Sequence, residues 1–211
     1  MKYENIDTLI FDYGGVLVNV DDSMVVESLK ELGLPRIKQF IYRKKLKDLL
    51  RDFIDGLIPT EVTLERMLQL CKKGTTKEEI IAVLCRLCGN LPKERLEALV
   101  ELRKRYKVYL LSNICDILWV QSMEQMRKHG YAPEDCFDRT FLSYEMGVAK
   151  PDRVIYEKMI AETGINPGNA LYFDDRKDNC ATGAAAGLNA VVVPVNMLET
   201  TQAFQAIVHS A

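Results

Sequence analysis

Short apolar runs alternate with amphipathic stretches along most of the chain. The runs with the composition of buried strands are rich in branched and aromatic residues and span 8–11, 108–111, 170–173 and 190–195, with a weaker fifth at 139–143. Helical patterns separate them over 94–106 and 154–162, and an alanine-rich helix ends at Gly187. Because strand and helix alternate, we predict an α/β fold, with a Rossmann-like parallel sheet and helices on both of its faces.

The interval 21–91 breaks this alternation because it contains no convincing strand. One helical face is marked by apolar residues at helical spacing, namely Leu64, Met67, Leu68 and Cys71. Thr75 with Glu78 predicts a capping box for the next helix. Earlier patterns indicate a helix that ends at Gly33 and one or two more over 37–54. We therefore expect a small helical bundle inserted after the first strand.

This insert defines the expected domain organisation. Residues 1–20 and 92–211 form the sheet domain, and residues 21–91 form a helical cap. In open parallel sheets, ligands bind beyond the carboxyl ends of the strands. An insert that leaves and re-enters at that edge is well placed to act as a lid over it.

Composition and charge narrow the class of protein. The chain has 211 residues and a formal net charge of −2, which gives it no general affinity for nucleic acid or for an anionic membrane. No apolar segment is long enough to span a membrane, and the N-terminus lacks the layout of a signal peptide. We expect a cytoplasmic protein that binds neither nucleic acid nor a membrane. The sequence does not indicate its oligomeric state.

Six cysteines raise the question of a metal or redox site. Cys85 and Cys88 have the spacing of a zinc-binding pair, but they fall in a helical stretch. No second pair of cysteines or histidines lies at metal-ligand spacing, since His129 and His209 are isolated. We interpret the cysteines as small buried apolar residues in a reducing compartment.

Polar residues follow the apolar runs where the strands are expected to end or just beyond a short loop. They are Asp12, Ser112, Asn113, Lys150, Asp174 and Asp175. A carboxylate can attack phosphorus to form an aspartyl-phosphate, and a divalent cation offsets the repulsion between that carboxylate and the phosphate. Because adjacent carboxylates disfavour joint ionisation without a cation, and oxygen ligands with phosphate suit Mg²⁺, the pattern predicts a magnesium site.

Each of these signals has a simpler interpretation when it is taken alone. An aspartate such as Asp12 near glycine often caps a turn, and an acidic pair can belong to a solvated loop that its own basic residues neutralise. A Ser-Asn pair after a strand usually forms a turn, and a lysine before a proline is usually on the surface. The signals are therefore specific only in combination.

Four segments resemble the motifs of the haloacid dehalogenase superfamily. They are FDYGGVL at 11–17, LSN at 111–113, GVAKP at 147–151, and FDD at 173–175 followed by Asn179. The resemblance covers essentially the whole chain, including a helical cap after the first motif. Within the superfamily, the chain is similar to the small sugar-phosphate phosphatases that resemble alpha-glucose-1-phosphate phosphatase, which share a turn like FIDGLI at 53–58.

The resemblance implies a Mg²⁺-dependent phosphatase that acts through an aspartyl-phosphate. It makes Asp12 the nucleophile and a metal ligand, and it gives Gly14 a metal-binding carbonyl oxygen. Ser112 and Asn113 would hold the phosphoryl group, and Lys150 would stabilise it. The acidic metal ligands would be Asp175, as the main one, with Asp174 beside it, directly or through water.

One position departs from the usual superfamily pattern. Members usually have a second aspartate, the general acid and base, where this chain has Gly14. Its loss typically costs about 10²–10⁴-fold in rate, although the similar glucose-1-phosphate branch also has glycine there. Asp21 or Asp22 could lend a proton from the entrance of the cap, but we favour a role in capping a helix that begins near Ser23.

The expected activity is hydrolysis of a small phosphorylated metabolite, with a sugar phosphate as the leading substrate class. One alternative, which rests on Gly14, is a catalytically weak or inactive ligand-binding or regulatory module. Another is a 2-haloacid dehalogenase, which the acidic pair disfavours because that branch lacks it. Candidates for substrate contact in the cap are Arg43, Lys44, Lys45, Lys47, Arg51 and Phe53, although a solvated basic helix face is the simpler interpretation for most of them.

Overall fold

A central parallel sheet organises the molecule. The computed structural model describes residues 5–21, 31–32 and 40–209. The sheet has the strand order β3-β2-β1-β4-β5, and its strands are β1 (Thr8–Phe11), β2 (Lys107–Ser112), β3 (Arg139–Leu142), β4 (Ala170–Asp174) and β5 (Asn189–Val192). Neighbouring strands run parallel throughout. The predicted α/β fold is confirmed.

Alternating side chains of β1 enter two separate apolar cores. Leu9 and Phe11 belong to a large cluster on one face of the sheet, whereas Ile10 belongs to a smaller cluster on the other face. All three are completely buried. Because successive strand residues point to opposite faces, a strand covered on both faces is expected to be apolar throughout, as β1 is at Leu9, Ile10 and Phe11.

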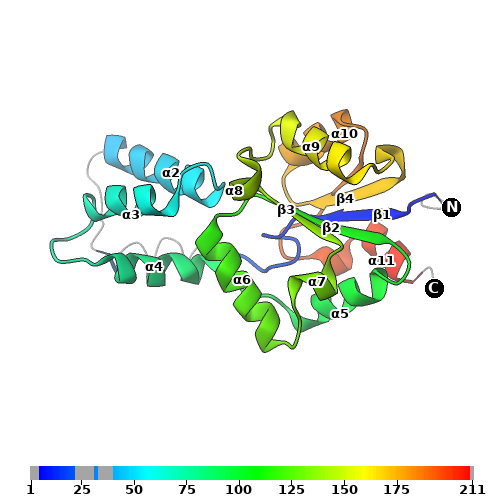
Figure 1. Cartoon of the computed structure of the whole chain (residues 1–211), viewed down its shortest axis with the longest axis horizontal. Helices are drawn as coiled ribbons and strands as arrows, with labels where there is room; N and C mark the ends of the chain where they lie inside the picture. The colour runs from blue at the N-terminus through cyan, green and yellow to red at the C-terminus, as the bar shows by residue number, and fades with distance from the viewer. Residues whose placement is uncertain (1–4, 22–30, 33–39, 210–211) are drawn as a thin grey trace.

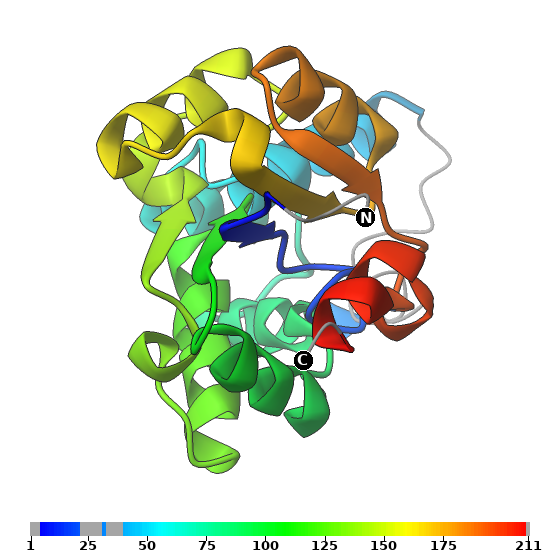
Figure 2. The ribbon, with the colours of Figure 1, turned by 90° about the vertical axis from the view of Figure 1, so that its right-hand side faces the viewer.

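Helices cover both faces of the sheet, as Figures 1 and 2 show. The smaller core lies under α9 (Arg153–Thr163) and α10 (Lys177–Ala185), and the larger lies against α5 (Lys93–Leu102), α6 (Asp116–Lys128) and α11 (Gln202–Val208). Shorter elements complete this part of the chain: α7 (Pro133–Cys136), α8 (Ser143–Met146), η2 (Pro167–Asn169) and η3 (Leu198–Thr200).

Two predicted boundaries differ from the observed ones by three residues or more. β5 ends at Val192 rather than at residue 195, and Pro194, which has no N–H, cannot extend the ladder of hydrogen bonds. The helix predicted over 94–106 ends at Leu102, where the backbone tightens into turns: the N–H groups of Lys104 and Arg105 bond three residues back.

The insert after β1 contains three described helices and one short turn. They are α2 (Phe40–Ile54), α3 (Thr60–Leu68), α4 (Lys77–Cys85) and the 3₁₀ turn η1 (Arg86–Cys88). They lie together at one end of the molecule, at the left in Figure 1, and we call them the cap. The boundaries proposed for it, 21–91, stay a prediction. Of the helix predicted to end at Gly33, only residues 31 and 32 are described, and Asp22 lies outside the described residues.

The predicted capping box was wrong by one residue. Thr76, not Thr75, caps α4: its hydroxyl accepts a hydrogen bond from the N–H of Glu79 at 3.2 Å, and the Glu79 carboxylate accepts one from the N–H of Thr76 at 2.9 Å. Thr75 instead donates its hydroxyl to the carbonyl of Lys72 at 2.9 Å. Likewise, α3 ends at Leu68, so Cys71 lies beyond the helix whose face it was predicted to share.

The two chain segments that join the cap to the sheet lie side by side. Asn19 and Asn90 exchange backbone hydrogen bonds of 2.8 and 3.0 Å. Gly89 has a φ of 73°, and a Cβ there would lie 2.4 Å from the carbonyl oxygen of Asn19. Only glycine permits this backbone conformation together with such a close approach.

Candidate active site

Three strands deliver polar side chains to one edge of the sheet. Asp12 follows β1, Ser112 ends β2 and Asp174 ends β4. The N–H of Asp12 still bonds to the carbonyl of Phe173 at 2.8 Å, so the sheet fixes its backbone. The side chains are buried, with Asp12 8% exposed and Asp174 completely enclosed.

Lys150 reaches this edge from the loop between α8 and α9. Its ammonium nitrogen lies 2.8 Å from Oδ1 of Asp12, 2.8 Å from Oδ2 of Asp174 and 2.7 Å from the carbonyl oxygen of Leu111. The three hydrogens of the ammonium group therefore each have an acceptor. Burial alone would lower the pKa of Lys150, but Asp12 and Asp174 more than offset it and raise that pKa, so the side chain stays charged.

The carboxylate of Asp174 is fully engaged by the protein. Besides Lys150, it accepts hydrogen bonds from Nδ2 of Asn179 at 3.0 and 3.1 Å, from the N–H of Arg176 at 2.8 Å and from the hydroxyl of Tyr172. Burial raises the pKa of Asp174, but Lys150 and these donors outweigh it and hold that pKa below its usual range. Asp174 is thus an ionised carboxylate that holds Lys150 in place.

Asp175 completes a group of three carboxylates. One oxygen from each of Asp12, Asp174 and Asp175 lies within 4.8 Å of the others. Burial, followed by the charge of Asp174, raises the pKa of Asp175. Burial also raises the pKa of Asp12 to about 7, with Lys150 acting against it. Such a cluster is costly to ionise without a cation.

The residues present fit a hard divalent cation. Asp12 and Asp175 offer the carboxylate oxygens that Mg²⁺ prefers as ligands, whereas the oxygens of Asp174 are engaged by the protein. Beside them, Oδ1 of Asn179 is buried and has no hydrogen-bond partner among the described residues. Gly15, with a φ of 76°, leaves room for Asp175, because a Cβ there would lie 2.6 Å from Oδ2 of Asp175. Asp12, Asp175 and the unpartnered amide oxygen together could surround a cation and its bound water.

Asn113 links the Lys150 loop to the cap. Its Nδ2 donates to the carbonyl of Lys150 at 2.8 Å and to Oδ1 of Asp55 at 3.1 Å, and its Oδ1 accepts from the N–H of Lys150 at 2.8 Å. Both amide hydrogens of Asn113 are therefore used within the protein. The next residue is also held, since the N–H of Ile114 bonds to the hydroxyl of Ser143 at 2.9 Å. The side chain of Asn113 thus binds Lys150 and Asp55 within the protein.

A cavity of about 360 Å³ opens above Asp12, between the sheet and the cap. Its charged lining residues are Asp12, Asp21, Asp55, Asp175, Lys150 and Arg176. Its apolar lining residues are Val20, Ile54, Leu87 and Leu118. Gly14 also lines it, and the nearest atom to a Cβ built there would be Cγ1 of Val20 at 3.7 Å. The lining of the cavity is therefore part charged and part apolar, and we call its four apolar residues the apolar wall.

The structure also shows which predicted cap residues face this cavity. Lys44, Lys45, Lys47 and Arg51 are exposed and do not line it, and Phe53 is completely buried. The side chain of Arg43 lies outside the described residues. Ile54, the last residue of α2, and Asp55, which follows it, line the cavity instead. Asp55 was missed, although it lies in the FIDGLI segment directly before Gly56.

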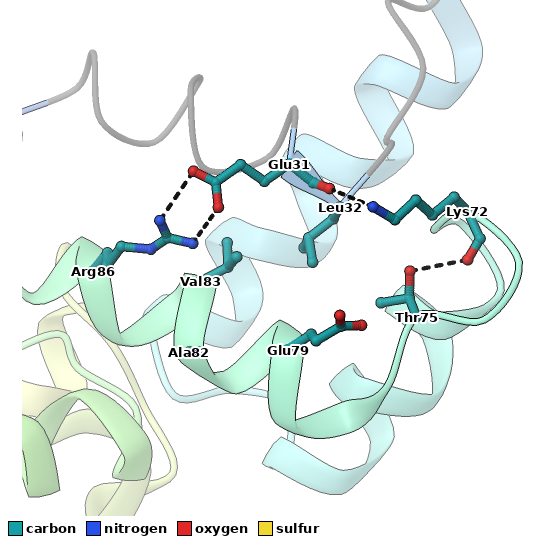
Figure 3. Close-up of a pocket in the computed structure, with 8 residues that line it drawn as sticks. All are labelled: Glu31, Leu32, Lys72, Thr75, Glu79, Ala82, Val83 and Arg86. Atoms are coloured by element: carbon teal, nitrogen blue, oxygen red, sulfur yellow. Dashed lines mark hydrogen bonds and ion pairs between the residues drawn. The ribbon is translucent and has the colours of Figure 1, made fainter.

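A second hollow, of about 190 Å³, lies within the cap (Figure 3). Its charged side chains are engaged by the protein: the guanidinium of Arg86 contacts the carboxylate of Glu31 at 3.0 and 2.6 Å, Lys72 donates to the backbone carbonyl of Glu31 at 3.2 Å, and the carboxylate of Glu79 accepts from the N–H of Thr76. No described residue lines both cavities. The chemistry of the strand ends therefore belongs to the cavity above Asp12.

The chain matches the model of a known protein family. The model, described as haloacid dehalogenase-like hydrolase, matches residues 6–187, which include all the strand-end residues named above. The chain belongs to the haloacid dehalogenase-like hydrolases. The predicted membership of the superfamily is thereby confirmed.

The sequence of this chain aligns with individual relatives over 85% or more of its length. It is 27% identical to a D-ribitol-5-phosphate phosphatase of Bacteroides thetaiotaomicron, over 97% of this chain and 100% of the relative. It is 29% identical to a sesquiterpene phosphatase of Aspergillus oryzae, over 85% of both chains. A solved haloacid dehalogenase family enzyme of Bacteroides thetaiotaomicron, in complex with magnesium and inorganic phosphate, matches with a TM-score of 0.82 and 29% identity over 90% of this chain and 96% of that one.

Among the described residues, none of the helices has both the length and the apolar character needed to cross a membrane.

Proposed function

We propose that this hydrolase is a Mg²⁺-dependent phosphatase of a small phosphorylated metabolite, and that it acts through an aspartyl-phosphate on Asp12. The observation that carries the proposal is the position of Asp12: a buried carboxylate at the end of the central strand, 2.8 Å from the ammonium of Lys150 and beside two further carboxylates. The relatives support the reaction class, because two of them are phosphatases.

The nucleophilic step follows from the charges around Asp12. One of its oxygens attacks phosphorus, the bond from phosphorus to the ester oxygen breaks, and that oxygen leaves with the electron pair and takes up a proton to become the alcohol. Water then attacks the phosphorus of the aspartyl-phosphate, the bond from phosphorus to the Asp12 oxygen breaks, and inorganic phosphate is released with the carboxylate restored. Lys150 lowers the repulsion between Asp12 and the phosphoryl group, and the hydroxyl of Ser112 with neighbouring backbone N–H groups would hold the phosphoryl oxygens.

The metal ligands in this proposal are Asp12, Asp175 and the carbonyl oxygen of Gly14. Asp174, which is occupied by Lys150, Asn179 and a backbone donor, would contact the cation only through water. Mg²⁺ bound there would supply positive charge against the nucleophile and the phosphate. The solved relative in complex with magnesium and inorganic phosphate supports this choice of metal.

The leaving group needs a proton that Gly14 cannot give. Asp21 lines the cavity and is exposed, so we propose it as the donor, in preference to the helix-capping role expected from the sequence. An alkyl phosphate makes a stronger demand on such a donor than an anomeric phosphate does. If the substrate is an alkyl phosphate, the reaction therefore depends more strongly on the proton donor than if it is an anomeric phosphate.

We propose a sugar or polyol phosphate as the substrate, and a cytoplasmic location in keeping with such a metabolite. The relative that aligns with 97% of this chain is a D-ribitol-5-phosphate phosphatase. The second candidate is a module that binds its phosphorylated ligand with little or no turnover, and Gly14 is the residue that favours it. A metal-free dehalogenase has no need for three clustered carboxylates.

Phosphate release over a panel of sugar, polyol and aryl phosphates, with and without Mg²⁺, tests the proposal. We expect release that depends on Mg²⁺ and is abolished by Asp12→Asn. Activity that persists in that variant would contradict the mechanism. An absence of turnover on every ester, combined with a thermal shift on adding a phosphate ester and Mg²⁺, would favour the binding module.

A further inference from the structure

We infer that Asp55 is a specificity-determining residue of the cap, whose carboxylate accepts hydrogen bonds from the hydroxyl groups of a neutral polyol tail and disfavours tails that carry a second anion. The inference rests on the proposed phosphatase function and names the substrate class for the same site. Asp55 of the cap would contact the part of the substrate that is not phosphate.

The backbone of the cap turn is held directly against the sheet domain. Gly56 has a φ of 72°, and a Cβ there would lie 2.6 Å from the backbone nitrogen of Tyr144 and 2.7 Å from the carbonyl oxygen of Ile114. The end of α2 meets α8 at this point in Figure 1. Phe53, which is completely buried, anchors the last turn of α2. The position of Asp55 relative to the sheet edge is therefore fixed by packing on both sides.

One oxygen of Asp55 is held by the protein and the other is not. Oδ1 accepts the hydrogen bond from Nδ2 of Asn113 at 3.1 Å, and the same Nδ2 donates to the backbone of Lys150. Oδ2 accepts no hydrogen bond from any residue that the structure describes. A half-buried carboxylate oriented through one oxygen, with its residue lining the cavity, is an acceptor prepared for a ligand.

The surroundings of Asp55 select the kind of ligand. Burial raises the pKa of this carboxyl, with Asn113 and the charge of Arg176 acting against it. A partly desolvated carboxylate gains more from a hydroxyl donor than an exposed one does, and it repels a second phosphate or carboxylate more strongly. Arg176, also in the lining, binds Asp178 through Nε and Nη2, and its remaining N–H groups can donate to hydroxyl oxygens. A chain of neutral hydroxyl groups fits both residues.

The apolar wall can contact the carbon backbone of a polyol tail, but it does not by itself distinguish a polyol from another kind of tail. Ile54, Leu87 and Leu118 line the same cavity and could contact either a polyol carbon chain or an isoprenoid tail. An isoprenoid tail would cover Asp55 without donating a hydrogen bond to it. Oδ2 of Asp55 would then be a buried, charged acceptor without a donor, which is unfavourable. Asp55 therefore favours the polyol over the isoprenoid.

Substrate specificity in Asp55→Asn provides the test. Asparagine keeps the size and removes the charge, and Asp52→Asn is the matched control, because Asp52 lies three residues earlier, in the last turn of α2, and bonds to Arg51 outside the cavity. We expect Asp55→Asn to raise KM for a pentitol 5-phosphate by about ten- to hundredfold. We expect KM for para-nitrophenyl phosphate to change less than about twofold, and the relative rate on a sugar bisphosphate to rise. Asp52→Asn should match the wild-type protein on all three.

Two results would overturn the inference: an equal loss on the aryl and the polyol ester, which indicates a structural or catalytic role, or no loss on the polyol ester. Failure of the proposed function is seen separately, as a lack of Mg²⁺-dependent turnover of para-nitrophenyl phosphate by the wild-type protein. In that event, calorimetric titration with the pentitol phosphate and Mg²⁺ still decides the role of Asp55. Weaker binding by Asp55→Asn than by Asp52→Asn supports it, and equal affinities reject it.

Discussion

The ammonium nitrogen of Lys150 lies 2.8 Å from Oδ1 of Asp12, and the side chains are 1% and 11% exposed. Charged groups so far from water are stable only when they are paired, and Lys150 pairs with both Asp12 and Asp174. The pair therefore ties the stability of the sheet edge to the chemistry proposed for it. It also means that changes at either residue act on folding and on activity together.

Lys150→Met should lower both stability and activity. Removing one partner of a buried ion pair leaves an uncompensated charge, which typically costs about 3–5 kcal/mol. We expect a loss of that size in the free energy of unfolding, measured in urea, and a fall of at least about 10²-fold in kcat. Arg139→Met is the control, since its ion pair with Glu162 is exposed and should contribute little. A Lys150 variant with wild-type stability would contradict the proposed charge balance.

Gly15→Ala should weaken Mg²⁺ binding. The added Cβ would lie 2.6 Å from Oδ2 of Asp175, so this carboxylate must move. Gly130→Ala separates that effect from backbone strain, because Gly130 also has a positive φ, of 86°, but no neighbour near its Cβ. Both variants should lose about 1 kcal/mol or more of stability. Only Gly15→Ala should raise the Mg²⁺ concentration needed for half-maximal activity; an equal rise in both would contradict the placement of the metal at Asp175.

Gly14→Asp should improve the hydrolysis of esters with poor leaving groups. A Cβ at Gly14 has its nearest neighbour at 3.7 Å, so a side chain fits toward the cavity. A proton donor there can contribute about 10²-fold or more to the rate with an alkyl phosphate, and less with an aryl phosphate. Gly14→Asn, which has the same size but no proton to exchange, is the control. Equal rates for the two variants would show that proton donation from this position does not limit the reaction.

Mg²⁺ affinity should rise with pH up to about 7 and then level off. Burial raises the pKa of Asp12 to about 7, so below that pH a proton competes with the cation for this carboxylate. Metal binding requires the ionised form and releases the proton, which gives about a tenfold loss of affinity for each pH unit below 7. Titration calorimetry in buffers with different heats of ionisation measures both the affinity and the proton release. An affinity that is constant between pH 5.5 and 8, to about twofold, would exclude Asp12 as a ligand that competes with a proton.

The fold could be predicted because its strands carry a strong local signal. A strand such as β1 is covered on both faces, so every residue from Thr8 to Phe11 is buried and the run is apolar apart from its first residue. The capping box could not be assigned in the same way. Thr75 and Thr76 are both followed by a glutamate three positions later, and the sequence alone does not decide between Glu78 and Glu79. The hydrogen bonds of the folded helix decide it.

The same distinction applies to the site. Asp12, Lys150, Asp174 and Asp175 could be expected to meet because strand ends of a parallel sheet share one edge, and the structure brings them together. Asp55 could not be found in this way. Its partner, Asn113, is 58 positions away, and their contact depends on how the cap packs on the sheet. Lys44, Lys45, Lys47 and Arg51 of α2 are more conspicuous in the sequence, yet they are exposed and do not line the cavity.

The covalent state of Asp12 during turnover tests the central claim most directly. Protein mixed with a pentitol phosphate and Mg²⁺ is quenched in acid within one turnover, digested and measured by mass spectrometry. The account predicts a phosphoryl group on the peptide that contains Asp12, removed by hydroxylamine and absent from Asp12→Asn, which should release no phosphate. Phosphate release that continues in Asp12→Asn, or rapid turnover without a labelled Asp12 peptide, would contradict it.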